Sequence, residues 1–406
     1  MRFARSRARW GRGSSVREAM RILHAIPMLD PRAGGPPAVV LRIAAGQAAL
    51  GHKVYLAHPP VGPDREADTL KSYQSIPGIE GVEFVEFDPS FANILGWIKR
   101  DPNLPKVDVA HLHAAWEPCL QGVARWATRS RIPYGFAPHG MLDVWSLEQK
   151  KWKKRLALAL GWRRVFNRAA FIHALNRDEQ DGLRPVGLTP PTEIIPNGIF
   201  MREIEPFPEP GRFRAAHPEI GSDPYILFLS RLHYKKGLDY LADAFAEVSR
   251  VRPEARLVVA GPDDGERAAF EQRIAQHRLS ARTHVIGPIY GRAKYEAMTD
   301  AACFCLPSRQ EGFSVAITEA LALSCPVVIT KECHFPEVAE AGAGFVTGLD
   351  ASEVAAGILK LLSDPAGARE MGRRGNSLVR ERFTWERIAQ QTLDAYRRHC
   401  GVGESA

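Results

Sequence analysis

Short apolar segments of strand length recur along the whole chain, and segments long enough for a helix separate them. Such alternation restricts the chain to the α/β class, because it predicts a parallel sheet wrapped by helices on both faces. The pattern restarts in the second half, which predicts a second sheet. The segments are 20–26, 53–57, 82–85, 109–113, 134–137, 171–175 and 193–195, followed by 225–229, 257–261, 284–287, 302–306 and 326–330.

Composition places the chain among ordinary globular proteins. With 406 residues, 45% hydrophobic and 25% charged, it has room for two domains. No run approaches the roughly 18 apolar residues of a membrane span, and no secretory signal is recognisable, so we expect a cytoplasmic protein. The six cysteines form no Cys-x-x-Cys pair, and we expect them to be reduced residues without a disulfide or a metal.

The net charge of +8 is concentrated in two segments. Residues 1–20 contribute +5, residues 150–168 contribute +8, and the remainder carries −5. This distribution argues against a broad nucleic-acid-binding face and for local contacts with something anionic. Residues 1–19 are rich in Arg, Gly and Ser and lack periodicity, so we expect a disordered tail or a misassigned start. A chain that begins at Met20 should therefore be folded and active.

The most informative stretch is 306–323, LPSRQEGFSVAITEALAL. A strand, a polar turn that holds Glu311, and a helix with Glu319 near the edge of its apolar stripe follow one another. In a parallel sheet the loop of such a unit lies at the carboxyl ends of the strands, where ligands bind. The amides that precede the helix, expected to bind an anion, are those of Gly312, Phe313 and Ser314.

A second candidate loop follows the strand at 225–229 and reads SRLHYKKG. Arg231 and Lys236 stand five apart around a strand-to-helix turn, so both can reach one anion. The guanidinium would fork onto phosphate oxygens, and the ammonium would act as a point charge. Lys235 is the alternative to Lys236.

The first half carries weaker signals. Its first strand feeds the loop 27–37 with Gly34 and Gly35, and a helical run at 38–50 follows. A phosphate-binding half-fold begins in this way, although the loop is neither a G-x-G-x-x-G nor a Walker sequence, and an ordinary flexible turn is the alternative. His139 follows the strand at 134–137, where an imidazole can hydrogen-bond a sugar hydroxyl. His111 and His113 alternate on one strand, and we interpret them as core and rim packing.

These motifs together resemble retaining glycosyltransferases of family four, which have the GT-B fold. The resemblance covers about residues 20–398, and its most specific part is the stretch Pro307, Ser308, Glu311, Gly312, Phe313 and Glu319. It implies two Rossmann-like domains that face each other across a cleft. Residues 20–200 would bind the acceptor, 201–222 would be a linker, 223–383 would bind the sugar nucleotide, and 384–400 would form a helix that returns to the first domain. Phe200 stands where the family usually has Asp after its hinge motif, which puts a polar role at that position in doubt.

The resemblance also implies roles for single residues. The reaction would move a sugar from a nucleotide diphosphate sugar to an acceptor hydroxyl with retention at the anomeric carbon. Arg231 and Lys236 would hold the donor diphosphate, Glu319 the ribose and Glu311 the donor sugar, Gly35 would let the backbone approach the donor phosphate, and His139 would touch the donor sugar. Whether Glu311 does more than position the donor stays open.

We expect no cofactor beyond the nucleotide sugar itself and no metal site. The chain contains no Asp-x-Asp triplet, and the cationic pair can stabilise the departing diphosphate. Three other functions remain as alternatives. A sugar-nucleotide epimerase or phosphorylase shares the architecture, a nucleic-acid binder rests on the basic tail alone, and an NAD oxidoreductase lacks its glycine fingerprint.

The basic segment at 141–168 suggests where the enzyme acts. It interleaves Trp145, Trp152, Trp162 and Phe166 with eight Lys and Arg. Such a surface is typical of docking on anionic lipid headgroups, which predicts a lipid-linked sugar acceptor at the inner face of the cell membrane, as in exopolysaccharide or other envelope assembly. A core-packed helix pair with solvated charges and a soluble acceptor is the alternative. The residues expected to face the membrane are Trp145, Lys150, Lys151, Trp152, Lys153 and Lys154.

Overall fold

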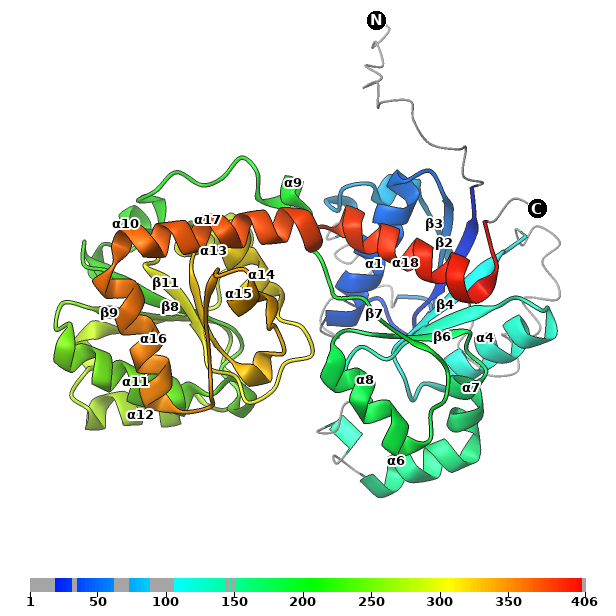
Figure 1. Cartoon of the computed structure of the whole chain (residues 1–406), viewed down its shortest axis with the longest axis horizontal. Helices are drawn as coiled ribbons and strands as arrows, with labels where there is room; N and C mark the ends of the chain where they lie inside the picture. The colour runs from blue at the N-terminus through cyan, green and yellow to red at the C-terminus, as the bar shows by residue number, and fades with distance from the viewer. Residues whose placement is uncertain are drawn as a thin grey trace, which may run out of the picture.

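The computed structural model of the chain describes residues 19–30, 35–61, 73–87, 106–142, 146–147 and 151–403. Two α/β domains lie side by side, each built on its own sheet (Figure 1). All strand pairings in both sheets are parallel, which confirms the predicted fold class. The expectations for residues 1–18 and for Gly34, Trp145 and Lys150 lie outside the described residues.

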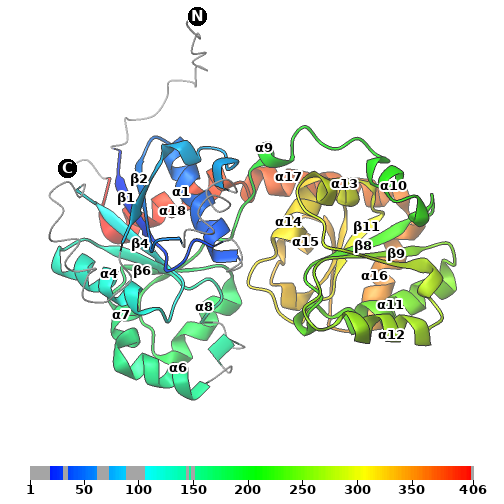
Figure 2. The same cartoon turned by 180° about the vertical axis from the view of Figure 1, so that it is seen from behind.

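The first sheet has seven strands and reverses its strand order between β1 and β4. Its strands are almost fully buried at the centre, because helices cover both faces (Figure 2). In spatial order they are β3 (Val82–Glu86), β2 (Lys53–His58), β1 (Arg21–Ala25), β4 (Val109–His113), β5 (Tyr134–Ala137), β6 (Phe171–Ala174) and β7 (Thr192–Ile194).

The second sheet has six strands in the same doubly wound order, and its reversal lies between β8 and β11. The loops that follow these two strands therefore meet at the switch point, where doubly wound folds bind ligands. In spatial order the strands are β10 (Thr283–Gly287), β9 (Arg256–Ala260), β8 (Tyr225–Leu229), β11 (Cys303–Leu306), β12 (Val327–Thr330) and β13 (Gly344–Thr347).

Helices connect the strands of each sheet. In the first domain they are α1 (Gly35–Ala49), α4 (Pro118–Arg129), α6 (Lys151–Ala157), α7 (Arg163–Asn167) and α8 (Arg177–Leu183). The second domain adds α9 (Met201–Ile204), α10 (Arg212–Ala216), α11 (Leu238–Val251), α12 (Arg267–Gln276), α13 (Arg292–Asp300), α14 (Val315–Ala322), α15 (Glu337–Glu340), α16 (Ala351–Ser363) and α17 (Pro365–Arg382). No helix in the described part of the chain is both long and apolar enough to cross a bilayer.

The structure differs from the sequence-based expectation at three places. Helix α1 begins at Gly35 rather than after Pro37, because the prolines occupy the first turn, where a missing N–H costs no hydrogen bond. The segment 201–222 is not a bare linker: it contains α9 and α10, and Phe213 packs in the core of the second domain. Strand β13 was not predicted, since its four residues include Gly344 and are only half buried.

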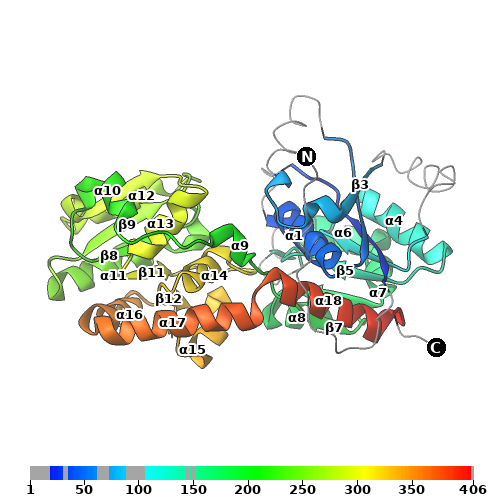
Figure 3. The same cartoon turned by 90° about the horizontal axis from the view of Figure 1, so that it is seen from above.

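The last helix, α18 (Trp385–Cys400), leaves the second domain and packs on the first (Figure 3). Thr384 caps it by accepting a hydrogen bond from the backbone N–H of Arg387. Trp385 and Tyr396 are both at most 1% exposed, and they join the core formed by α1 and β1. Helix α18 is therefore part of the first domain's core although it follows the second domain in the chain.

Candidate active site

The loop that follows β11 holds Glu311 in a buried setting. The residue is 7% exposed, and its carboxylate accepts a hydrogen bond of 2.7 Å from the Ser308 hydroxyl, while its backbone N–H donates to the Glu332 carbonyl. Helix α14 begins directly after Ser314, so Gly312, Phe313 and Ser314 form the approach to its N-terminus. The structure thus places the loop as the sequence predicted and holds Glu311 by one side-chain contact and one backbone contact.

A close backbone contact joins this loop to the one that follows β8. Gly237 has φ +67°, and a Cβ built on it would lie 1.9 Å from the carbonyl oxygen of Pro307. Only glycine combines this left-handed conformation with so close an approach. The contact brings Lys236 next to Glu311, and their Nζ and Oε1 atoms lie 2.6 Å apart.

The other cations of the β8 loop have separate partners. Arg231 is 60% exposed and pairs with Asp264 at 2.5 Å. Lys235, the alternative to Lys236, donates to the side chain of Gln310 at 2.9 Å. Lys236 is therefore the one that faces Glu311. Asp264 lies between β9 and α12, and its contact with Arg231 carried no local sequence signal.

Glu319 lies deeper than its place in the sequence pattern suggested. It was expected near the edge of the apolar stripe of α14, but its residue is only 6% exposed. Lys294, from α13, pairs with it at 2.5 Å and satisfies the buried charge. Sequence reasoning missed Lys294, because a single lysine in a polar helix looks like any solvated residue.

In the first domain, His139 and Gly140 form a strained turn at the carboxyl end of β5. Their φ angles are +53° and +77°, and a positive φ is uncommon for a residue other than glycine. Glu179, which is 2% exposed, holds the turn: one carboxylate oxygen accepts from the Gly140 N–H at 2.7 Å and the other from the Leu175 N–H at 2.8 Å. Sequence reasoning found His139 and missed Glu179.

His139 is continuous with a group of buried imidazoles behind it. His113 contacts it at 2.9 Å, and His24, His111 and His173 complete the group. Desolvation, with the charge of His173 as a smaller cause, lowers the pKa of His139 to about 3. Burial likewise lowers the pKa of His24 to about 4 and that of His173 to about 4, so these side chains are neutral near pH 7. The prediction that His111 and His113 pack in the core holds for both, since each is 0% exposed.

Two contacts join the domains beside the candidate site. The Asn176 amide donates to the carbonyl of Gly312 at 2.5 Å, and the same side chain caps α8 by accepting from the N–H of Glu179. His334 lies 3.6 Å from Asp178 across the same boundary. Asn176 therefore connects the loop that follows β11, in the second domain, with the turn at His139 in the first.

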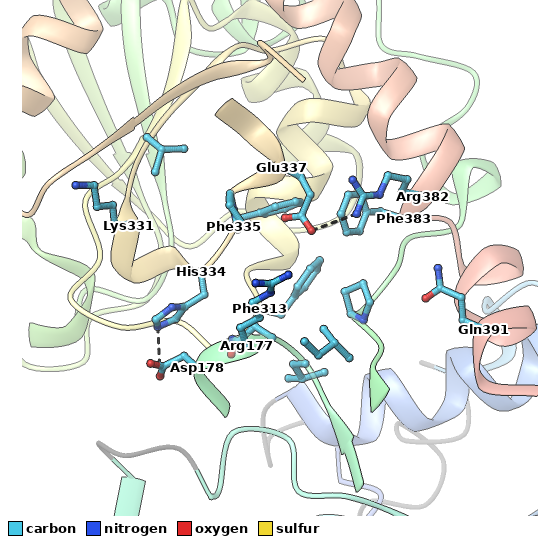
Figure 4. A pocket seen from close by; sticks show the side chains of 16 residues that line it. Arg177, Asp178, Phe313, Lys331, His334, Phe335, Glu337, Arg382, Phe383 and Gln391 are labelled. Carbon is cyan, nitrogen blue, oxygen red and sulfur yellow. Dashed lines mark hydrogen bonds and ion pairs between the residues drawn. The ribbon is translucent and has the colours of Figure 1, made fainter. Parts of the chain in front are cut away.

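A cavity of about 530 Å³ lies between the domains (Figure 4). Residues of both domains line it, with the His334–Asp178 and Arg382–Glu337 pairs drawn across it. Of the predicted site residues, only Phe313 is among those that line it, where it packs near Phe335 and Phe383. Gly35, His139, Arg231, Lys236, Glu311 and Glu319 lie elsewhere, so this cavity is distinct from the predicted donor site.

Two doubly wound domains, the second with a lysine–glutamate pair at its switch point, form the GT-B architecture of glycosyltransferases. Comparisons with known families support this class: "Glycosyl transferases group 1" matches residues 211–377 and "Glycosyl transferase 4-like domain" matches residues 34–198. The chain belongs to the glycosyltransferases of this family-4-like group.

Individual relatives agree. The alpha-maltose-1-phosphate synthase of Mycobacterium tuberculosis is 28% identical over 312 residues, covering 72% of this chain and 79% of that protein. The D-inositol 3-phosphate glycosyltransferase of Jonesia denitrificans is 24% identical over 410 residues, covering 94% and 96%. Among solved structures, Anabaena HepE in complex with UDP matches with a TM-score of 0.74 and 20% identity, over 93% of this chain and all of that one. The likeness to HepE shows the fold.

Proposed function

We propose that the protein transfers a sugar from a nucleotide diphosphate sugar to an acceptor hydroxyl with retention of anomeric configuration. The observation that carries this proposal is the Lys236–Glu311 pair at the switch point of the second sheet, with Arg231 in the same loop. Breaking the glycosidic bond leaves charge on a diphosphate, and cations positioned beforehand stabilise that charge. HepE, which shares the fold, has been solved in complex with UDP and with UDP-glucose, and this supports a nucleotide sugar as donor.

In the proposed mechanism the Lys236 ammonium and the Arg231 guanidinium contact the donor diphosphate. Glu311 holds the donor sugar, Glu319 the ribose hydroxyls, and the amides near Gly312 add positive ends of dipoles at the leaving group. A front-face path, assisted by the leaving group, needs no protein nucleophile. Asp264, Glu311 and Glu319 each pair with an arginine or a lysine, and we propose that the reaction proceeds without a metal, so that excess chelator leaves its rate unchanged.

A screen of nucleotide sugars by thermal shift tests the donor, because a ligand that binds only the folded state raises its stability. The stabilising sugar is then incubated with candidate acceptors, and the anomeric configuration of the product is read by NMR. Retention supports the proposal, and inversion contradicts it. Epimerised donor in the absence of acceptor would favour the epimerase, and release of free sugar phosphate from a glycoside and phosphate would favour the phosphorylase.

We further propose that the acceptor is lipid-linked and that the enzyme binds the inner face of the cell membrane during envelope or exopolysaccharide assembly. The support is an exposed basic-aromatic face on α6, on the short π-helical segment Leu158–Trp162 and at the start of α7. Helix α6 has no buried residue, and Trp152, Leu156 and Leu160 are 67%, 51% and 71% exposed. The exposed cations of this face are Lys151, Lys153, Arg155, Arg163 and Arg164.

Two parts of the segment behave differently from the expectation. Trp162 and Phe166 are 4% and 0% exposed and pack in the core of the first domain, so their aromatic rings do not reach a membrane. Lys154 donates to the hydroxyl and the carbonyl of Ser146 and lies over the ring of Trp116. Among the described residues of the face, Trp152 is thus the aromatic side chain that would insert into the membrane. Lys151 and Lys153, its neighbours in the chain, are the cations beside it.

A cavity of about 320 Å³ adjoins this face, and its lining suits an amphiphilic ligand. Its lining combines apolar side chains with cations, and the described residues that line it include no acid: Leu147, Lys151, Lys154, Arg155, Leu158, Arg163, Gly182, Pro185 and Val186. Cations over an apolar floor suit an anionic headgroup with a lipid tail.

Liposome flotation tests this part. Binding should require anionic lipid and weaken with salt, because each cation near the surface contributes about 1 kcal/mol. The variant Lys151→Ser/Lys153→Ser/Arg155→Ser should lose binding. The control Arg129→Ser/Arg250→Ser/Arg369→Ser removes the same charge from exposed positions elsewhere and should retain it. Equal binding to neutral and anionic vesicles would contradict the proposal and favour a soluble acceptor.

A further inference from the structure

A hydrogen-bonded chain of buried side chains runs through the first sheet to His139. Gln47 Oε1 contacts His24 Nε2 at 2.8 Å, and His24 Nδ1 contacts His113 Nε2 at 2.8 Å. His113 Nδ1 then contacts His139 Nε2 at 2.9 Å. Gln47, His24 and His113 are each 0% exposed, so no water competes for these contacts.

The chain has a direction because the Gln47 side chain turns its carbonyl oxygen, and not its NH2 group, toward His24, and an oxygen of this kind can only accept. A neutral imidazole has one N–H and one lone pair, and the Gln47 carbonyl oxygen requires a donor. His24 therefore donates from Nε2 and accepts at Nδ1. His113 must then donate from Nε2 and accept at Nδ1, and the proton that it accepts comes from Nε2 of His139. Each link follows from the one before it, provided that all three imidazoles are neutral.

Neutrality follows from the surroundings of the chain. Burial lowers the pKa of His24 and of His139 to about 4 and about 3, and it lowers that of His113 well below its ordinary value. The ring of His111 stacks on His24, and the ring of His173 packs on His111, so neither supplies a negative charge. The Glu179 carboxylate beside the His139 turn accepts from the backbone N–H groups of Gly140 and Leu175. The His139 side chain has no hydrogen bond from Nδ1 within the described residues.

We propose that the Gln47–His24–His113 chain holds His139 in the tautomer whose Nδ1 carries a lone pair, so that His139 accepts a hydrogen bond from a substrate hydroxyl. The substrate part of this inference rests on the proposed function, while the tautomer rests on the chain alone. Gln47, His24 and His113 are positioning residues that act through His139. The strained backbone of His139, fixed by Glu179 through Gly140, supports a functional orientation of this ring.

A metal ion is the competing explanation for this group. Ligand atoms of His24, His111 and His113 all lie within 4.8 Å of one another. The rings of His24 and His113 are stacked with an interplanar angle of 30°, however, and rings that share a metal converge on one point instead. Their nitrogens are 2.8 Å apart, which is shorter than the edge of about 3.3 Å that tetrahedral zinc with its usual bond lengths requires.

Histidine nitrogen NMR on the full chain, without substrate, tests the tautomer directly. Protein labelled with ¹⁵N-histidine is recorded at pH 7.5, and the His139 signals are assigned by their loss in His139→Asn. The expected spectrum shows His139 with Nε2 protonated and Nδ1 bare. A single tautomer protonated at Nδ1 would overturn the proposal, as would stoichiometric metal in the purified protein. This measurement needs no variant of the chain residues to fold.

Two variants distinguish an effect of the hydrogen-bonded chain on His139 from an effect of core packing alone. Gln47→Met keeps the shape but removes the acceptor, so it should give His139 a mixture of tautomers and lower kcat/KM by about three- to tenfold. Thr392→Val removes a buried hydroxyl of the same core, which donates to the Ile388 carbonyl at 2.9 Å and not to the chain, and it should leave both readouts unchanged. An unaltered His139 spectrum in folded Gln47→Met would overturn the proposal. If the tautomer is as expected but no nucleotide sugar is turned over, the proposed function fails and the tautomer assignment stands.

Discussion

Lys236 and Glu311 stand 75 residues apart in the chain, yet their charged atoms lie 2.6 Å apart. The side chains are 13% and 9% exposed, so this pair is shielded from salt and solvent far more than a surface ion pair. Its existence depends on the contact between Gly237 and Pro307, which brings two loops of the second sheet together. The pair is the centre of the candidate donor site.

The cations of the β8 loop should differ in their effect on catalysis. Lys236→Ala and Arg231→Ala should each lower kcat/KM by about one to two orders of magnitude, because each removes a cation that would stabilise the negative charge of the leaving diphosphate. Lys235→Ala is the matched control, since its ammonium contacts Gln310 instead. Steady-state kinetics with the identified donor measures kcat/KM for the three variants and the wild type. Wild-type rates in both Lys236→Ala and Arg231→Ala would remove these residues from the site.

Lys294 should be required for stability as well as for donor binding. Lys294→Met leaves the Glu319 carboxylate, only 8% exposed, without its cation, and we expect the free energy of unfolding to fall by about 3 kcal/mol. The double variant Lys294→Met/Glu319→Gln removes the unpaired charge and should recover most of that loss. Urea unfolding measures all three proteins. Equal stability of Lys294→Met and the wild type would show that water satisfies Glu319.

Gly237 offers a way to separate the two loops of the donor site. In Gly237→Ala the new Cβ would lie 1.9 Å from the Pro307 carbonyl oxygen, so the loops must move apart and donor affinity should be lost. Gly265→Ala is the matched control: its φ is +95°, but no atom lies within 4 Å of the built Cβ. It should cost only the conformational strain of about 1–2 kcal/mol and retain donor binding. Thermal shift with donor measures both effects.

The buried histidines predict a steep loss of stability in mild acid. Their pKa values in the folded protein are lowered, to about 4 for His24 and His173, from an ordinary 6.5. Below pH 6.5 the unfolded chain therefore binds protons that the folded chain does not. The stability from neutral burial is present above pH 6.5 and is lost as the pH falls toward 4, by up to about 1.4 kcal/mol per pH unit for each imidazole.

Differential scanning calorimetry at pH 7.5 and 5.5 checks this sign. We expect a clearly lower midpoint at pH 5.5, where ordinary carboxylates are still ionised and cannot account for the change. The dependence should be smaller in His173→Phe, which removes one of the titrating groups. A midpoint that is equal or higher at pH 5.5 would mean that the imidazoles are already protonated in the folded state.

The sequence by itself determined the two parallel sheets and the loops of the site. Strand periodicities are local properties, so β4 and β5 begin and end where the pattern placed them. The spacing of Glu311, Gly312 and Glu319, and of Arg231 and Lys236, likewise marked both loops before any contact was known. Strand β13 was not predicted, because its four half-buried residues form too short a hydrophobic pattern to identify a strand.

Only the tertiary structure decided which side chains meet. Lys294 reaches Glu319 from another helix, and His24 reaches His139 through a histidine on a neighbouring strand. Such partners depend on strand order and helix packing, which single residues in a sequence do not encode. Burial then sets the chemistry, because a lysine or histidine that looks solvated in the sequence becomes a buried partner or a neutral imidazole once neighbouring elements exclude water.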